Sequence, residues 1–123
     1  PGVNCGFKGM QLSVTSLACA VRQMAGPSSI HSLPTEQYNQ DMVSLGMHAA
    51  VTAMDALECL RNETAMLLLA ASQAVDLRGG PEKLGRGSRR RYDEVRKRAL
   101  FQDKDRPMEN EVAEVAAMVG SAW

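Results

Sequence analysis

The chain has 123 residues, which is enough for about one domain because domains usually contain ~100–200 residues. Apolar residues make up 45% of the sequence and charged residues 23%, ordinary values for a globular protein that argue against wholesale disorder. Ala, Leu and Met are common and aromatic residues make up only 4%, a mixture that favours helices and nearly excludes an all-β sandwich.

The formal net charge is zero, but the charge is distributed unevenly. Residues 1–77 carry 3 basic and 6 acidic groups (net −3), residues 78–106 carry 11 and 5 (net +6), and residues 107–123 carry 0 and 3 (net −3). This asymmetry predicts segment boundaries near these positions. No run free of Asp, Glu, Lys and Arg exceeds 13 residues, short of the ~20 that cross a bilayer, so we expect no membrane span.

The three cysteines, Cys5, Cys19 and Cys59, are odd in number and lack the spacing of a zinc site. We therefore expect reduced thiols, with no disulfide framework and no metal site. The sequence begins at Pro1 without a charged segment leading into an apolar one, so no secretory signal is visible. We expect a cytoplasmic protein whose natural chain begins further upstream.

Two helices are predicted to begin before residue 42. Apolar residues recur at three- and four-residue steps over residues 9–25, which is the helical period. Glycine, serine and proline in residues 26–34 end this helix. We expect Thr35 to cap a second helix whose first turns carry Glu36 and Asp41, acids that the helix dipole favours there.

From residue 42 onward the sequence is apolar almost all round, which is typical of a helix that is buried on most sides. The exception is a narrow polar stripe at Ser44, His48, Thr52 and Asp55. Polar residues 61–63 interrupt the pattern, so the segment up to residue 77 is either one long bent helix or two helices in series. The sequence Arg-Gly-Gly-Pro at residues 78–81 is a strong helix stop.

The remaining residues predict two shorter helices. One extends over residues 89–101 after a cap at Ser88, and the last begins at residue 105 and has an apolar stripe within residues 112–119. The sequence thus predicts an all-α fold of four or five helices, with a long buried helix and several shorter ones. A helix of ~35 residues is ~50 Å long, whereas a compact domain of this size has a radius of gyration of ~14 Å. We therefore expect the chain to be part of a larger helical-bundle assembly.

The densest polar cluster, residues 35–41, contains the best candidate site. On a helix, Glu36, Asn39 and Gln40 would share a face, because they are spaced i, i+3 and i+4. That face either holds a polar ligand or satisfies the hydrogen bonds of the helix start, and composition does not decide between the two. Lys8 either extends into solvent or pairs with Glu36, which the turn at residues 26–29 would bring back towards it.

The other polar features favour structural roles. His31 and His48 have no matching set of metal ligands or catalytic partners, so we interpret both as structural. The basic segment contains Arg89, Arg90, Arg91, Arg96, Lys97 and Arg98. Acidic residues interrupt it and only Tyr92 is available for stacking, which favours a solvated helix face over a nucleic-acid site. The chain has no phosphate-binding loop and no HExxH motif.

Four segments resemble the C-terminal part of the aromatic amino acid ammonia-lyases and aminomutases. They are GFKGMQ at residues 6–11, SLPTEQYNQDMVSLG at residues 32–46, AVDLR at residues 74–78 and DKDRP at residues 103–107. The resemblance covers essentially the whole chain, and the fifteen-residue central motif is specific. It divides the chain into residues 1–80, which belong to the bundle and the pocket wall, and residues 81–123, which form a basic loop and closing helices.

The resemblance implies a helical homotetramer whose long helices form a central bundle. Enzymes of this family use a methylidene-imidazolone electrophile made from an Ala-Ser-Gly tripeptide, which this sequence lacks. The nearest match, residues 71–73, reads Ala-Ser-Gln. The family's catalytic tyrosine and carboxylate-binding arginine also belong to earlier sequence. We therefore expect no catalytic residue in this segment, which should be inactive alone.

By the same resemblance, Glu36 and Gln40 line the substrate pocket near the amine and the prosthetic group. Lys8 lies close to Glu36 and would hold it ionised, and Asn39 belongs to the same substrate-binding set. The combination of Lys and Glu is similar to phenylalanine-type members. The sequence thus predicts part of an ammonia-lyase acting on an aromatic L-amino acid, phenylalanine before tyrosine, with no metal and no nucleic-acid partner. The alternatives are an aromatic amino acid 2,3-aminomutase and a non-catalytic helical oligomerisation module.

Overall fold

A computed structural model describes residues 3–121. The described part contains four α-helices and two short 3-10 helices, and its only β-type pairing is one isolated bridge. In chain order the elements are α1 (Lys8–Met24), η1 (Ser28–His31), α2 (Gly46–Leu77), η2 (Pro81–Lys83), α3 (Arg86–Arg96) and α4 (Glu109–Ser121). The predicted all-α fold is therefore confirmed. Residues 1–2 and 122–123 lie outside the described residues. They include Pro1 and the outer ends of the two segments predicted above, residues 1–80 and 81–123.

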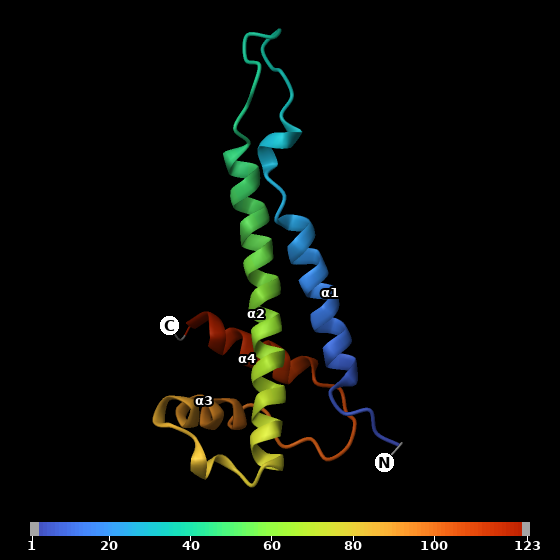
Figure 1. Cartoon of the computed structure of the whole chain (residues 1–123), viewed down its shortest axis with the longest axis vertical. Helices are drawn as coiled ribbons and strands as arrows, with labels where there is room; N and C mark the ends of the chain where they lie inside the picture. The colour runs from blue at the N-terminus through green and yellow to red at the C-terminus, as the bar shows by residue number, and fades with distance from the viewer. Residues whose placement is uncertain (1–2, 122–123) are drawn as a thin grey trace.

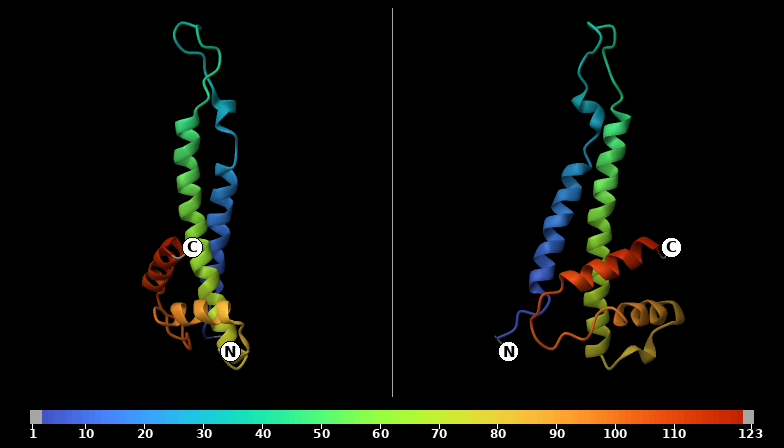
Figure 2. Two further views of the ribbon diagram at one scale, coloured as in Figure 1. Left: turned by 90° about the vertical axis from the view of Figure 1, so that its left-hand side faces the viewer. Right: turned by 180° about the vertical axis from the view of Figure 1, so that it is seen from behind.

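The long helix α2 is the axis of the molecule. It is a single helix of 32 residues, so it measures ~48 Å at 1.5 Å per residue. Helix α1 lies antiparallel along its N-terminal and middle parts, whereas α3 and α4 lie across its C-terminal part (Figures 1 and 2). Polar residues 61–63 do not interrupt α2, because Arg61 pairs with Glu58 (3.1 Å) and the Asn62 amide donates to the Glu58 carbonyl (3.0 Å).

The predicted helix start at Thr35 is wrong. Residues 32–45 form a loop, which we name the tip loop because it lies at the far end of the molecule (Figure 1). The backbone N–H groups of Thr35 and Gln40 donate to each other's carbonyls (3.0 and 3.3 Å), so these groups are not available to a helical ladder. Glu36, Gln37 and Tyr38 take left-handed φ values of 50°, 55° and 70°. Helix α2 begins only after Leu45, and Asp41 is therefore not in its first turn.

The two C-terminal helices are also displaced from their predicted limits. Helix α3 spans Arg86–Arg96 instead of residues 89–101, because Gly85 precedes its first turn and Ser88 lies inside it. Helix α4 begins at Glu109, where two acidic residues in the first turn complement the helix dipole. It does not begin at Asp105, because the Asp105 carboxylate accepts hydrogen bonds from residues 5 and 6.

The core is small and lies where α3 and α4 cross α2. It consists of Ala65, Leu69, Val95, Ala99, Val115, Ala116 and Met118. The prediction that the long helix is buried on most sides does not hold within this chain, because only Ala65, Leu69, Ser72 and Gln73 of α2 are buried. Met47, Val51, Met54 and Leu57, spaced as one helical stripe, are 53–80% exposed. Within residues 3–121, no other element covers most of this stripe.

We predict that the isolated chain self-associates in dilute buffer, because association would cover the apolar stripe of α2. Sedimentation velocity at increasing concentration measures this association. The double substitution Met47→Lys and Met54→Lys should weaken it.

Asp55→Lys is the matched control, since it also changes the net charge by +2 but lies beside the stripe on the same helix, and it should leave the association unchanged. A chain that remains monomeric and fully helical at all concentrations would contradict the prediction.

Candidate functional site

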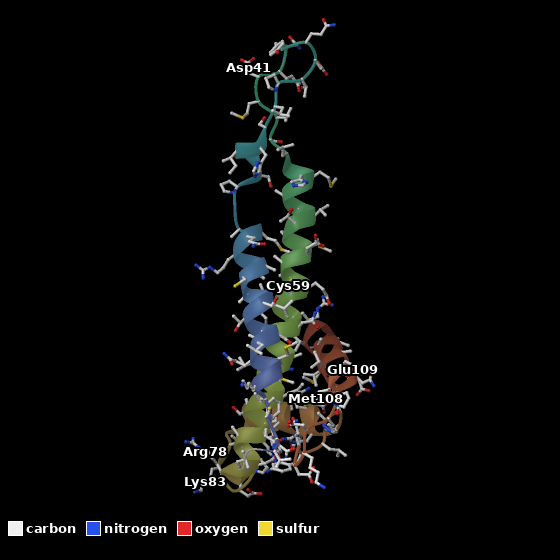
Figure 3. The ribbon with its side chains drawn as sticks, turned by 90° about the vertical axis from the view of Figure 1, so that its right-hand side faces the viewer. Asp41, Cys59, Arg78, Lys83, Met108 and Glu109 are labelled. Atoms are coloured by element: carbon white, nitrogen blue, oxygen red, sulfur yellow. The ribbon has the colours of Figure 1, made fainter. Side chains whose placement is uncertain are left out.

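The tip loop holds three of the four predicted site residues. Glu36, Asn39 and Gln40 are all exposed there, at the end of the molecule where Figure 3 labels Asp41. The Asn39 N–H donates to the Glu36 carbonyl (3.0 Å), and the Thr35 hydroxyl donates to the Gln40 side-chain oxygen (3.2 Å). The three residues are thus brought together by a tight loop, and the predicted helical face is wrong.

The neck of the tip loop is fixed as well. The Val43 N–H donates to the Ser32 hydroxyl (2.8 Å), and this hydrogen bond joins the segment that enters the loop to the segment that leaves it. Among the residues that the structure describes, the Glu36 carboxylate has neither a hydrogen bond nor an ion pair. The loop therefore presents an acceptor carboxylate beside two amides, a set that suits an ammonium or other hydrogen-bond donor.

Lys8, the fourth predicted residue, lies at the other end of the molecule. It is the exposed first residue of α1, and the 17 residues of this helix separate it from η1 and the tip loop by at least ~25 Å. The expected reversal at residues 26–29 is wrong: the chain continues past η1 to the tip loop and turns back only there, so α2 does not begin beside the start of α1 (Figure 1). The expected Lys8–Glu36 pair therefore does not form within one chain.

A cavity of ≈450 Å³ lies beside the start of α1. Its lining comes from α1, α2, α4 and the segments leading into α1 and α4, and includes Phe7, Met10, Met66, Gln102, Arg106 and Met108. Figure 3 labels Met108 at this level of the molecule. Within the described residues, the Gln102 side-chain oxygen and one terminal nitrogen of Arg106 are buried without a hydrogen-bond partner. The sequence analysis missed both residues, because their burial depends on segments that meet only in the folded chain.

The segment before α1 is tied to the segment before α4. The Asp105 carboxylate accepts the N–H of Cys5 (2.6 Å) and the N–H of Gly6 (2.9 Å). In return, the Asp105 N–H donates to the Asn4 side-chain oxygen (3.5 Å). This contact joins parts of the chain that are about a hundred residues apart, and it lies immediately before Lys8.

A second polar cluster holds α3 against α2. Arg96 pairs with Asp76 (2.5 Å), and the Tyr92 hydroxyl donates to the same carboxylate. This hydrogen bond, together with burial, raises the pKa of Tyr92. The Gln73 amide also donates to the Gln102 carbonyl (2.8 Å) and accepts the Gln102 N–H (3.1 Å). Most of these polar groups bond to one another, which indicates a structural role, although the Nε of Arg96 is buried without a partner among the described residues.

The basic segment is neutralised largely by acidic residues of the chain itself. Arg89 pairs with Asp93 (2.9 Å), and Glu94 pairs with both Lys97 (2.6 Å) and Arg98 (3.0 Å). These two cations lower the pKa of Glu94 to about 2, and the hydrogen bond to Lys97 has the largest effect. The pairing supports the interpretation of a solvated helix face and weakens the case for a nucleic-acid site.

The remaining candidate groups add no site. Cys5 and Cys19 are exposed, Cys59 is half-buried, and all three are free thiols. Between residues 3 and 121, no group of three or more potential ligands comes together as a metal site. His31 lies in η1 and His48 in α2, both exposed. None of the described helices is long and apolar enough to cross a membrane.

Comparisons with known proteins agree with this architecture. The model of the aromatic amino acid lyase family matches residues 1–97. A tyrosine ammonia-lyase of Cupriavidus metallidurans is 37% identical over 96% of this chain and 22% of its own length. Histidine ammonia-lyase 1 of Fusobacterium nucleatum is 39% identical over 87% of this chain and 21% of its own length. The crystal structure of a tyrosine aminomutase from Streptomyces globisporus matches 97% of this chain and 22% of its own, with a TM-score of 0.90 and 34% identity. The chain thus spans about a fifth of the length of these relatives.

We predict that Asp76→Asn destabilises the docking of α3 by ~1.5–3 kcal/mol, the usual value for hydrogen bonds to a charged group. Hydrogen exchange of the amides of residues 86–96 measures this local opening. Asp93→Asn is the control, because it removes an exposed i, i+4 pair worth only ~0.3–0.5 kcal/mol. Equal loss of protection in the two variants would contradict the assigned role of Asp76.

Proposed function

Because this chain belongs to the aromatic amino acid lyase family, we propose that it forms one wall of the substrate pocket of an ammonia-lyase. The proposed substrate is an aromatic L-amino acid, phenylalanine before tyrosine. The aromatic class rests on family membership and on the similarity to tyrosine and histidine ammonia-lyases. The preference for phenylalanine rests on the presence of both Lys8 and Glu36, the combination that resembles phenylalanine-type members.

The tip loop is the single observation that carries this proposal. Its backbone hydrogen bonds hold Glu36, Asn39 and Gln40 in one exposed cluster, and the Glu36 carboxylate lacks a partner among the described residues. In the pocket, this carboxylate would accept hydrogen bonds from the substrate ammonium and take part in proton transfer. The amides of Asn39 and Gln40 would orient the substrate beside it.

The electrophile must come from other parts of the enzyme. In this family a methylidene-imidazolone, when bound, supplies the electrophilic carbon. The nearest tripeptide in this chain, Ala71-Ser72-Gln73, does not fit its precursor. It lies inside α2, with Ser72 and Gln73 buried and the Gln73 side chain engaged with Gln102. The role of this chain is therefore to bind and orient the substrate, and we expect the segment alone to be inactive.

A pocket that contains both Lys8 and Glu36 requires more than one copy of the chain. Lys8 is the first residue of α1 and Glu36 lies in the tip loop, beyond the other end of that helix, so an antiparallel neighbour would place the tip loop of one copy beside Lys8 of another. The uncovered apolar stripe of α2 supports such packing, because a neighbouring helix would bury it. The proposed assembly is the helical homotetramer that the family resemblance implies, a cytoplasmic enzyme that takes the aromatic amino acid as its substrate.

The 2,3-aminomutase reaction is the alternative chemistry, and the similarity to a tyrosine aminomutase favours it. In that reaction the ammonia that is eliminated returns to the neighbouring carbon before the product leaves. The alternative that is not an enzyme is a non-catalytic helical oligomerisation module. The mass of the natural polypeptide separates this module from the enzyme: a product of 13.3 kDa without lyase activity would favour the module.

We predict that Glu36→Gln in the complete enzyme lowers kcat/KM about a hundredfold, within the range for loss of a proton-transfer group. Glutamine keeps the size of the side chain but removes the charge that would attract the substrate ammonium. Steady-state kinetics with phenylalanine and tyrosine measures the loss, and size-exclusion chromatography should show an unchanged tetramer.

Asp41→Asn is the matched control, because Asp41 is another exposed carboxylate of the same loop, and its kinetics should change little. Wild-type kinetics of the Glu36→Gln enzyme would remove Glu36 from the pocket.

A further inference from the structure

We propose that Asp105 is a positioning residue for Lys8: it fixes the turn from which Lys8 projects and thereby sets the place of the Lys8 ammonium in the substrate pocket. This inference rests on the proposed function, in which Lys8 contributes to the pocket. It adds a residue from the far end of the chain that the sequence analysis assigned only to the start of a helix.

The contact between Asp105 and the turn uses both carboxylate oxygens. One oxygen accepts the Cys5 N–H at 2.6 Å, and the other accepts the Gly6 N–H at 2.9 Å. Hydrogen bonds to an ionised acceptor are roughly twice as strong as neutral ones, and two parallel bonds also fix orientation. The Asn4 side chain accepts the Asp105 N–H in return, so the contact is reciprocal.

The turn transmits this position directly to Lys8. The Lys8 N–H donates to the Cys5 carbonyl (3.2 Å), which closes a four-residue turn. Gly6 occupies this turn with a φ of +57°, a conformation that side-chain-bearing residues adopt at a cost. Phe7 packs against the hydrophobic core and accepts the Gln11 N–H at its carbonyl (2.9 Å). Lys8 therefore follows a turn that is anchored on one side by Phe7 and on the other by Asp105.

Helix α1 lacks the usual capping groups at its start. Its N-cap residue makes no side-chain hydrogen bond, and its first turn contains no acidic residue. A lysine as the first residue of a helix is also unfavourable, because the helix dipole is positive at that end. The Asp105 carboxylate does not cap the first turn, since it accepts the N–H groups of Cys5 and Gly6, but it places a carboxylate next to the turn that precedes Lys8. A position that breaks the local rule and is compensated from a distant segment is typical of a functional site.

A double-mutant cycle in the complete enzyme tests the inference. Lys8→Met, Asp105→Ala and the double variant are compared by kcat and KM. With Lys8 present, Asp105→Ala should lower kcat/KM about tenfold, within the loss that a small misplacement of a binding group produces. The loss should be distributed between kcat and KM in the same proportion as the loss caused by Lys8→Met. In the Lys8→Met enzyme the same change should cost less than about twofold, because the two residues act through one interaction.

Two further variants separate positioning from general destabilisation. Asp105→Asn keeps one acceptor oxygen and should retain intermediate activity, and it replaces Asp105→Ala in the cycle if the alanine enzyme does not assemble. Asp103→Ala removes a nearby exposed carboxylate that does not contact the turn, and it should leave kcat/KM unchanged.

The outcomes distinguish the inference from the function on which it rests. If Lys8→Met impairs the enzyme but the effects of Asp105 and Lys8 are additive, Asp105 does not act through Lys8 and the inference is overturned alone. If Lys8→Met has wild-type kinetics, the place of Lys8 in the pocket is overturned, and the positioning role of Asp105 is lost with it.

Discussion

The structure depends on one constraint, a helix that is much longer than the rest of its chain can cover. Helix α2 has 32 residues and a length of ~48 Å, whereas the buried core lies only where α3 and α4 cross its C-terminal part. Because α1 runs antiparallel beside it, the chain is an extended rod with one end packed and the other end open. The positions of Lys8 and the tip loop at opposite ends follow directly from this arrangement.

The sequence predicts most strongly those elements whose signals are local. The glycine and proline residues after α1 and α2 mark the helix ends well, because their backbone preferences do not depend on distant contacts. The tip loop was mispredicted because its helical spacing competes with a backbone bridge between Thr35 and Gln40, which leaves no sequence pattern. The start of α4 was misplaced for a comparable reason, since Asp105 is held by residues a hundred positions away.

The candidate site divides in the same way. The density of polar groups around Glu36 and Gln40 is a sequence property, so the sequence alone proposes these residues, although their predicted helical face is wrong. The expected approach of Lys8 to Glu36 within one chain required knowledge of how far α1 extends before the chain turns, and composition does not give it. Gln102 and Arg106 were missed because their buried, unpartnered atoms exist only where α1, α2 and the segment before α4 meet.

The tip loop has a strained backbone that contacts from surrounding structure would stabilise. Three consecutive residues without glycine, Glu36 to Tyr38, hold left-handed backbone angles, which cost of order 1–3 kcal/mol each and persist only where surrounding structure over-determines them. Among the described residues, the loop is held by hydrogen bonds between its own residues: the Thr35–Gln40 bridge, the Asn39–Glu36 backbone bond, the Thr35–Gln40 side-chain contact and the Ser32–Val43 bond. The strain and the uncovered stripe of α2 therefore lie on the same open half of the rod. A neighbouring chain packed against this half would bury the stripe and support the loop in one step, so the geometry of the proposed pocket would depend on the proposed assembly.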